Sequence, residues 1–192
     1  MTATPDASQG LQTWHLPAMR AVPALLVGLP LPFVQLHSPF VGLVALALLT
    51  GLGAAALWLG RGLVPAEARG WPAQAAGWSA LAALVAVVLA LLSPTETSFG
   101  LLVAAWGIGA GALELAGWWR LRRAAEPRTL RLARDWRAVG AATIILGVVF
   151  ALVRDAVTLT GLLGAYAVVV GVYLALAALS ARPARTTERS DA

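Results

Sequence analysis

Long apolar stretches and short polar segments alternate along the whole chain. None of the apolar stretches shows the period-two alternation of a barrel strand. Each is about 16 to 25 residues long, close to the roughly 20 residues that a helix needs to cross about 30 Å of hydrocarbon. The pattern therefore predicts an all-α integral membrane protein with six transmembrane helices. The six stretches run from about Ala21 to Leu36, Phe40 to Gly60, Ala75 to Leu92, Phe99 to Trp119, Ala138 to Val153, and Val157 to Ala181.

The connections between these stretches are of two kinds. Three are very short, at residues 35–40, 93–99 and 153–158, whereas those at 61–74 and 120–137 are longer and charged. Because helices joined by a few residues are usually antiparallel neighbours, the short connections predict three helical hairpins. The predicted hairpins are 21–60, 75–119 and 138–181 within one transmembrane domain, 21–181; residues 1–20 form a cytoplasmic N-terminal tail and 182–192 a disordered cytoplasmic C-terminal tail.

Composition and charge support a membrane location and predict an orientation. The chain is 59% hydrophobic and only 12% charged, against about 25% charged residues in soluble domains. Its fourteen basic residues are all arginine, and only Arg154 falls on the side of the short connections. The positive-inside rule therefore places both termini and the two longer loops in the cytoplasm. Although the net charge is +5, no soluble domain remains to bind nucleic acid.

The connection 120–137 carries most of the candidate lipid contacts. Its arginines alternate with leucine, alanine and tryptophan. This segment is interpreted as an ordinary basic loop on the headgroups, with a docking helix for anionic lipid as the alternative. We expect the lipid bilayer as the partner, and leave open a homo-oligomer and a scaffold role through this loop. The candidate headgroup contacts are Arg120, Arg122, Arg123, Arg128, Arg131 and Arg134.

Tryptophans gather near the predicted cytoplasmic ends of the helices. An indole suits a position that is wet on one side and apolar on the other. We therefore expect them to anchor the helices at the membrane surface. These tryptophans are Trp71, Trp78, Trp118, Trp119 and Trp136.

The last two predicted hairpins repeat each other with an offset of 60 residues. The shift places Ala104 on Gly164 and Trp106 on Tyr166. Small residues recur at helical spacing in this repeat, and close contact of helix backbones depends on them when no water is expelled. The glycines expected at helix interfaces are Gly107, Gly111, Gly140, Gly147, Gly164 and Gly171.

The segment GALELAGWWRLRR, Gly111 to Arg123, ends the fourth apolar stretch. With the preceding turn and its proline it resembles the HdeD-like acid-resistance membrane proteins and their short DUF308 repeat. The resemblance covers about 75–182, although the last hairpin has Leu174 where the segment has Glu114. It implies a small inner-membrane protein associated with survival of acid stress in some bacteria, without an established catalytic activity or cofactor.

Residues able to support catalysis or bind a metal are scarce. The chain has no cysteine, and His15 and His37 lie in the predicted tail and in a short connection. A metal site needs three or four converging donors, and no nucleophile, phosphate-binding or zinc motif is present. We therefore expect no enzyme activity, no metal and no cofactor.

Glu114 is the candidate intramembrane polar site. It lies six residues before Arg120, about 9 Å of helix rise from the predicted cytoplasmic surface. It either accepts hydrogen bonds from a neighbouring helix or exchanges a proton, since burial favours the neutral carboxyl. Because only Thr50 and Thr143 join it as inward polar candidates, we expect a non-enzymatic membrane protein that contributes to acid or general stress tolerance or to membrane organisation. The alternative is a small transporter or channel subunit in which Glu114 is a proton or cation site.

Overall fold

Six long helices make up almost all of the residues that the structure describes. The computed structural model describes residues 14–64, 69–123, 127–153 and 155–181 and contains no strand within them. All six helices are long and apolar enough to cross a membrane, the first together with the short turn that follows it. They are α1 (His15–Gly28), α2 (Pro39–Gly60), α3 (Gly70–Leu92), α4 (Glu96–Leu121), α5 (Pro127–Leu152) and α6 (Ala156–Ser180), with 3₁₀ turns η2 (Leu31–Phe33) and η3 (Arg61–Leu63).

The helices that follow a short connection begin with side-chain caps. The first N–H groups of a helix lack carbonyl partners within it, and a Ser, Thr or Asp oxygen can accept from them. Ser38 accepts from the Val41 N–H at the start of α2, and Asp155 accepts from the Thr158 N–H at the start of α6. Thr95 begins α4 with a reciprocal capping box. These local signals therefore fix where each short connection ends.

The helices begin earlier than the hydrophobic pattern predicts, and the difference is largest for α1 and α5. α1 begins at His15, so residues 15–20, expected in the N-terminal tail, are helical. α5 begins at Pro127 and takes up much of the segment expected to be a loop. Both extensions bury apolar side chains, including Leu16 at 1% exposure and Ala133 at 1%, although arginines interrupt the apolar run. Packing of one face therefore makes these segments helical.

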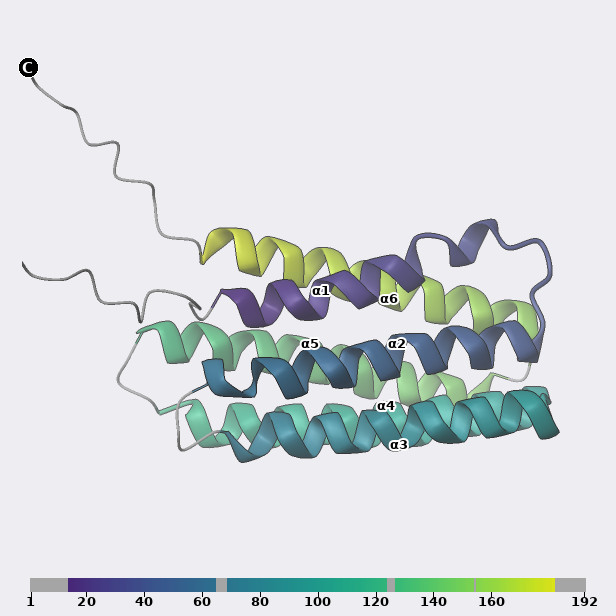
Figure 1. Ribbon diagram of the computed structural model, residues 1–192, viewed down its shortest axis with the longest axis horizontal. Coiled ribbons are helices and arrows are strands. Elements are labelled where there is room, and N and C mark those ends of the chain that lie inside the picture. Colours follow the sequence, from purple (N-terminus) through teal and green to yellow (C-terminus); the bar gives the residue numbers. More distant parts are fainter. Residues whose placement is uncertain (1–13, 65–68, 124–126, 154, 182–192) are drawn as a thin grey trace, which may run out of the picture.

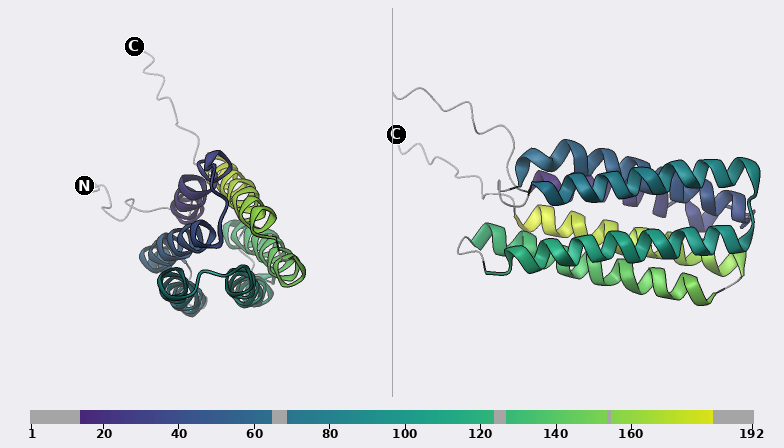
Figure 2. Two further views of the ribbon diagram at one scale, coloured as in Figure 1. Left: turned by 90° about the vertical axis from the view of Figure 1, so that its right-hand side faces the viewer. Right: turned by 90° about the horizontal axis from the view of Figure 1, so that it is seen from below.

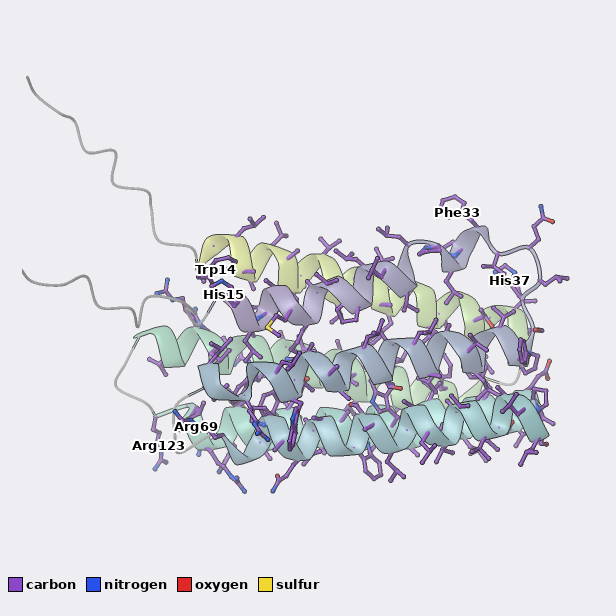
Figure 3. The ribbon with its side chains drawn as sticks, viewed as in Figure 1. Trp14, His15, Phe33, His37, Arg69 and Arg123 are labelled. Carbon is purple, nitrogen blue, oxygen red and sulfur yellow. The ribbon has the colours of Figure 1, made fainter. Side chains whose placement is uncertain are left out.

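The six helices form a ring in which consecutive helices run in opposite directions (Figures 1 and 2). We call the end where α1 begins and α6 finishes the basic end, because Arg69 and Arg123 lie there, and the opposite end, with His37, the turn end (Figure 3). The most extensive packing joins α2 to α3, α4 to α5, and α6 to α1. The closest interfaces therefore lie between the predicted hairpins, and the two helices within each predicted hairpin pack less closely.

Glycines bring the backbones of α4 and α5 into contact. A Cβ on Gly111 would lie 2.6 Å from the carbonyl oxygen of Gly140, and one on Gly107 would lie 2.8 Å from that of Thr143. On the α5 side, a Cβ on Gly147 would come within 2.9 Å of a backbone nitrogen of α4. Any side chain at these positions must push the helices apart, so this interface depends on glycine.

Glycines of α6 lie against the first helix instead. A Cβ on Gly171 would lie 2.8 Å from Leu25 of α1, and one on Gly164 would lie 3.3 Å from Leu31 of η2. Gly28 of α1, which the repeat did not single out, lies opposite them and would place a Cβ 2.7 Å from the Val168 nitrogen. These contacts close the ring between the first and the last helix.

Two large apolar clusters fill the ring, one toward each end, and a third, smaller cluster consists of Ala21, Val139, Val170 and Leu174. The turn-end cluster includes Leu43, Leu46, Phe99, Phe150, Leu159 and Leu163. The basic-end cluster includes Leu16, Leu57, Val64, Trp71, Leu132 and Trp136. The polar side chains of the interior lie between these two clusters.

Candidate functional site

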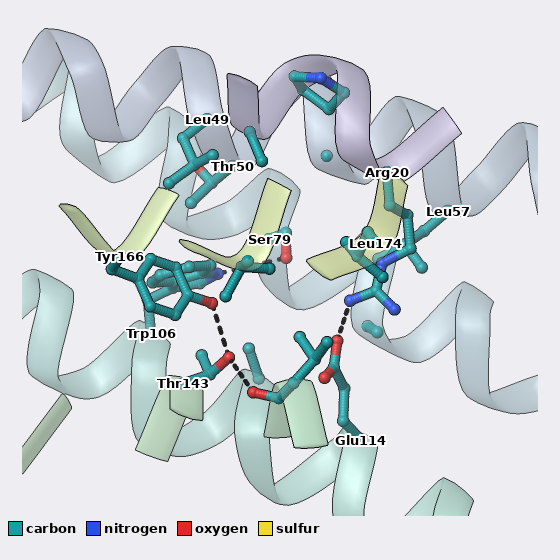
Figure 4. Close-up of a pocket in the computed structure, with 17 residues that line it drawn as sticks. Arg20, Leu49, Thr50, Leu57, Ser79, Trp106, Glu114, Thr143, Tyr166 and Leu174 are labelled. Carbon is teal, nitrogen blue, oxygen red and sulfur yellow. Dashed lines mark hydrogen bonds and ion pairs between the residues drawn. The ribbon is translucent and has the colours of Figure 1, made fainter. Parts of the chain in front are cut away.

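A polar chamber lies at the centre of the ring, and all six helices contribute to its wall (Figure 4). Its volume is about 70 Å³. Because one buried water molecule needs about 10–15 Å³ of cavity volume, the chamber has room for about five water molecules. What can bind in a space of this size is therefore water, an ion, or a molecule of a few non-hydrogen atoms.

An ion pair crosses the chamber. The Arg20 guanidinium of α1 donates to the Glu114 carboxylate of α4, and the two side chains are only 12% and 7% exposed. Helices α1 and α4 are not neighbours in the ring, so the pair joins opposite sides of it (Figure 4). Arg20 also lies 6.0 Å from the centre of the Trp71 ring, on the side of the basic end. Each charge thus has an opposite charge beside it, as buried charges require.

One carboxylate oxygen of Glu114 has no hydrogen-bond partner among the described residues. Oε1 accepts from Arg20, whereas Oε2 is buried and accepts no hydrogen bond from the described residues. An ionised carboxylate has about four acceptor positions, and buried polar atoms are nearly always satisfied by protein or ordered water. Oε2 is therefore available to bind a proton, a water molecule or a donor group of a guest.

Hydroxyl groups from α5 and α6 form a second polar feature of the wall. The Thr143 hydroxyl donates to the Val139 carbonyl at 2.7 Å and lies 2.6 Å from the Tyr166 hydroxyl (Figure 4). Because threonine has one hydroxyl hydrogen, Tyr166 is the donor in the second contact. The Tyr166 oxygen keeps its own lone pairs for another donor.

A third polar contact joins α3 to α4. The Trp106 indole N–H donates to the Ser79 hydroxyl oxygen at 3.3 Å, and the Trp106 ring meets Tyr166 edge to face at a centroid distance of 6.2 Å. Thr50 of α2 is 1% exposed and donates to the Leu46 carbonyl at 2.7 Å. Polar groups from every helix of the ring therefore face one small volume.

These contacts cross between closely packed helix pairs. Arg20 belongs to the α6–α1 pair and Glu114 to the α4–α5 pair. Tyr166 and Thr143 join the same two pairs, and Ser79 links the α2–α3 pair to Trp106 of α4. Glycine and apolar contacts hold each pair together, whereas polar contacts in the chamber tie one pair to another.

Aromatic side chains pack against each other toward both ends of the ring. At the basic end, Trp71 and Trp136 stack at a centroid distance of 3.8 Å, beside Gly117, whose missing Cβ would lie within 3.0 Å of both rings. Their buried indole N–H groups have no partner among the described residues. At the turn end, Phe99 and Phe150 meet edge to face at 5.7 Å. An aromatic pair therefore packs toward each end of the ring, and the chamber between them is only partly enclosed.

Sequence reasoning identified only part of this site. Glu114, Thr50 and Thr143 do lie on the chamber wall. Arg20 was assigned to the N-terminal tail, yet it is the partner of Glu114, because α1 begins before it. Tyr166 was also missed, although the 60-residue repeat had already matched it to Trp106, its neighbour in the chamber.

The tryptophans expected at the membrane surface divide into two groups. Trp71 and Trp136 are 2% and 1% exposed, so they are core residues and the anchor interpretation is wrong for them. Trp119 is 58% exposed at the basic end, where the Arg122 guanidinium lies 3.3 Å from its ring centre. Exposure in the fold, not position along the helix, separates the two groups.

The other candidate residues lie away from the chamber. His15 and His37 are at opposite ends of the molecule, and the described residues contain no group of three or more potential ligands that could hold a metal (Figure 3). Most of the candidate headgroup arginines lie along the basic end: Arg120, Arg122, Arg123, Arg131 and Arg134. The side chain of Arg128 and the tails 1–13 and 182–192 lie outside the described residues. Comparison of the chain with protein-family models, curated proteins and solved structures gave no match.

Proposed function

We propose that this chain is a multi-pass protein of a bacterial inner membrane, with its basic end in the cytoplasm. The six apolar helices and their exposed leucines and valines support insertion, and the arginines support the orientation. Since the chain has no cysteine, single cysteines can report the topology. A cysteine at Ser38 or Thr95 is expected to react with an impermeant thiol reagent from outside, and one at Ala125 is not. The reverse labelling would overturn this orientation.

Within that membrane protein, we propose a small transporter that moves protons through Glu114. The observation that carries the proposal is the buried Arg20–Glu114 pair in the central chamber, where one carboxylate oxygen has no hydrogen-bond partner among the described residues. Intramembrane ionisable groups are costly and usually mark ion or substrate pathways. The hydroxyls of Thr143 and Tyr166 provide the additional polar groups expected along a proton path.

The arrangement of polar contacts suggests how a proton is coupled to movement. When Glu114 takes up a proton it becomes neutral, and its attraction to Arg20 is lost. Because this ion pair ties the α6–α1 pair to the α4–α5 pair, its loss frees the two closely packed units to shift against each other. A shift that separates the rings of either aromatic pair would open the chamber further toward one side of the membrane.

Proton flux into liposomes tests the transport proposal. Purified protein is reconstituted with a pH-sensitive dye inside the vesicles, and a membrane potential drives protons across. We expect the wild type to acidify the lumen faster than protein-free vesicles, and Glu114→Gln to lose this flux because an amide does not titrate. Glu96→Gln, at the turn end, removes an acid outside the chamber and is expected to keep the flux. Equal rates for wild-type and protein-free vesicles would refute the proposal.

The second candidate function is a contribution to acid or general stress tolerance, or to membrane organisation, without transport. The resemblance to the HdeD-like family suggests it, and the aromatic pairs packed toward both ends of the ring favour a static role. Survival at low pH of cells that produce wild type or Glu114→Gln separates the candidates. A stable, correctly inserted Glu114→Gln protein that still supports survival favours the static role.

A further inference from the structure

A charged groove lies between α5 and α6 at the basic end, away from the central chamber. Its volume is about 450 Å³, within the range of ligand sites in proteins. It opens where α5 and α6 pack less closely than either does with its other neighbour. Arg131, Arg134 and Asp135 line one wall, and Tyr173 and Ser180 line the other.

The groove carries a net positive charge. Arg131 and Arg134 are exposed, and neither forms an ion pair within the described residues. The one acid, Asp135, accepts a hydrogen bond from the Tyr173 hydroxyl at 3.0 Å, which holds the carboxylate against α6. Two guanidinium groups one helical turn apart thus remain available to an anion, and guanidinium binds phosphate through paired N–H donors.

An apolar strip continues from the groove along the surface of α6. Leu176 on the groove wall is 58% exposed, and Val172 and Val169 beyond it are 45% and 66% exposed. The spacing of three and four residues places all three on one helix face, in line with Tyr173. A free phosphate ion would make no contact with this apolar strip, whereas the acyl chain of a lipid would cover it.

We propose that this groove is a binding site for an anionic phospholipid, with the headgroup phosphate between Arg131 and Arg134 and an acyl chain along Leu176, Val172 and Val169. Basic pockets between transmembrane helices on the cytoplasmic side bind such headgroups. The inference rests on the proposed insertion and orientation, and it is independent of proton transport through Glu114. It also differs from the diffuse headgroup contacts predicted for the basic segment, because it uses two specific arginines together with residues of α6.

Native mass spectrometry of the detergent-solubilised full chain with added phosphatidylglycerol measures binding directly. We expect Arg131→Gln/Arg134→Gln to weaken binding about 30-fold, the equivalent of about 1 kcal/mol for each arginine. The matched control is Arg122→Gln/Arg123→Gln, which removes the same charge from the same end outside the groove. It is expected to change affinity less than about threefold, because only diffuse attraction is lost.

A further variant and two competitors complete the test. Ala177→Phe fills the groove and leaves every charge in place, so it is expected to reduce binding even if the arginine variant fails to fold. Phosphatidylcholine and glycerol phosphate, added separately, are expected not to displace phosphatidylglycerol. Equal losses in the two arginine pairs would reduce the site to general surface charge and overturn the proposal. Displacement by glycerol phosphate would equally overturn it, in favour of a phosphate site. Neither outcome depends on the proton-flux result.

Discussion

Removing either partner of the Arg20–Glu114 pair is expected to destabilise the protein strongly, and removing both is not. The two side chains are 12% and 7% exposed, so each single change leaves a charge in a region from which water is largely excluded. Breaking a buried ion pair on one side costs about 3–5 kcal/mol, whereas replacing both partners with apolar residues of similar volume is often neutral. We therefore expect Arg20→Met/Glu114→Leu to unfold close to wild type.

The two single variants are not expected to be equal. In Arg20→Met the remaining Glu114 can take up a proton and become neutral, which limits the cost. In Glu114→Leu the remaining arginine keeps its charge, because a guanidinium is not deprotonated in proteins. Glu114→Gln also leaves the arginine without an opposite charge. We therefore expect it to lower the free energy of unfolding by more than the about 1–2 kcal/mol that the loss of one hydrogen bond would cost. Glu114→Leu is therefore expected to be the least stable of the cycle.

Denaturant unfolding of the four purified proteins in one detergent gives the coupling energy of the cycle. A value of about 3 kcal/mol or more is expected, with Arg20→Met recovering stability as the pH falls. If the double variant loses the sum of the two single losses, the side chains do not interact and the account of the chamber is wrong. A stable double variant without proton flux supports the transporter, and one that supports survival like wild type supports a static role.

Three further results are expected from the fold. Gly111→Leu should lower the free energy of unfolding by at least about 1–3 kcal/mol, because its Cβ meets a backbone oxygen at 2.6 Å, while Gly161→Leu on an open surface should not; equal melting temperatures would contradict the interface. Trp71→Ala removes one ring of the indole stack toward the basic end and should increase the proton leak of reconstituted vesicles, and an unchanged leak would mean that this stack does not limit proton access to the chamber. Hydrogen bonds from the Thr158 hydroxyl and N–H hold the pKa of Asp155 below its ordinary value, so its capping contribution is complete above about pH 4 and is lost as the pH falls through the lowered pKa. Asp155→Asn should abolish that part of the acid dependence of the melting temperature. If wild type and variant give identical profiles of melting temperature against pH, the Asp155 cap is not the source of this dependence.

The sequence by itself determined the number of long helices and, for α2, α4 and α6, where they begin to within three residues. Length and apolarity alone identify a segment that can cross a membrane, and Ser38, Thr95 and Asp155 mark helix starts through local hydrogen bonds. The glycine pattern also indicated Gly107 and Gly111 as interface positions, and both lie against α5. These properties depend on residues close together in the chain, so a linear pattern can reveal them.

Only the tertiary structure decided which side chains meet. Helices that are apolar on all sides carry little sign of which face points inward, so the sequence did not distinguish the buried Trp136 from the exposed Trp119. The pairing of Arg20 with Glu114 joins residues 94 positions apart on helices that are not neighbours in the ring. It exists because α6 packs on α1 and closes the ring, which turns Arg20 toward the centre and gives the carboxylate its opposite charge.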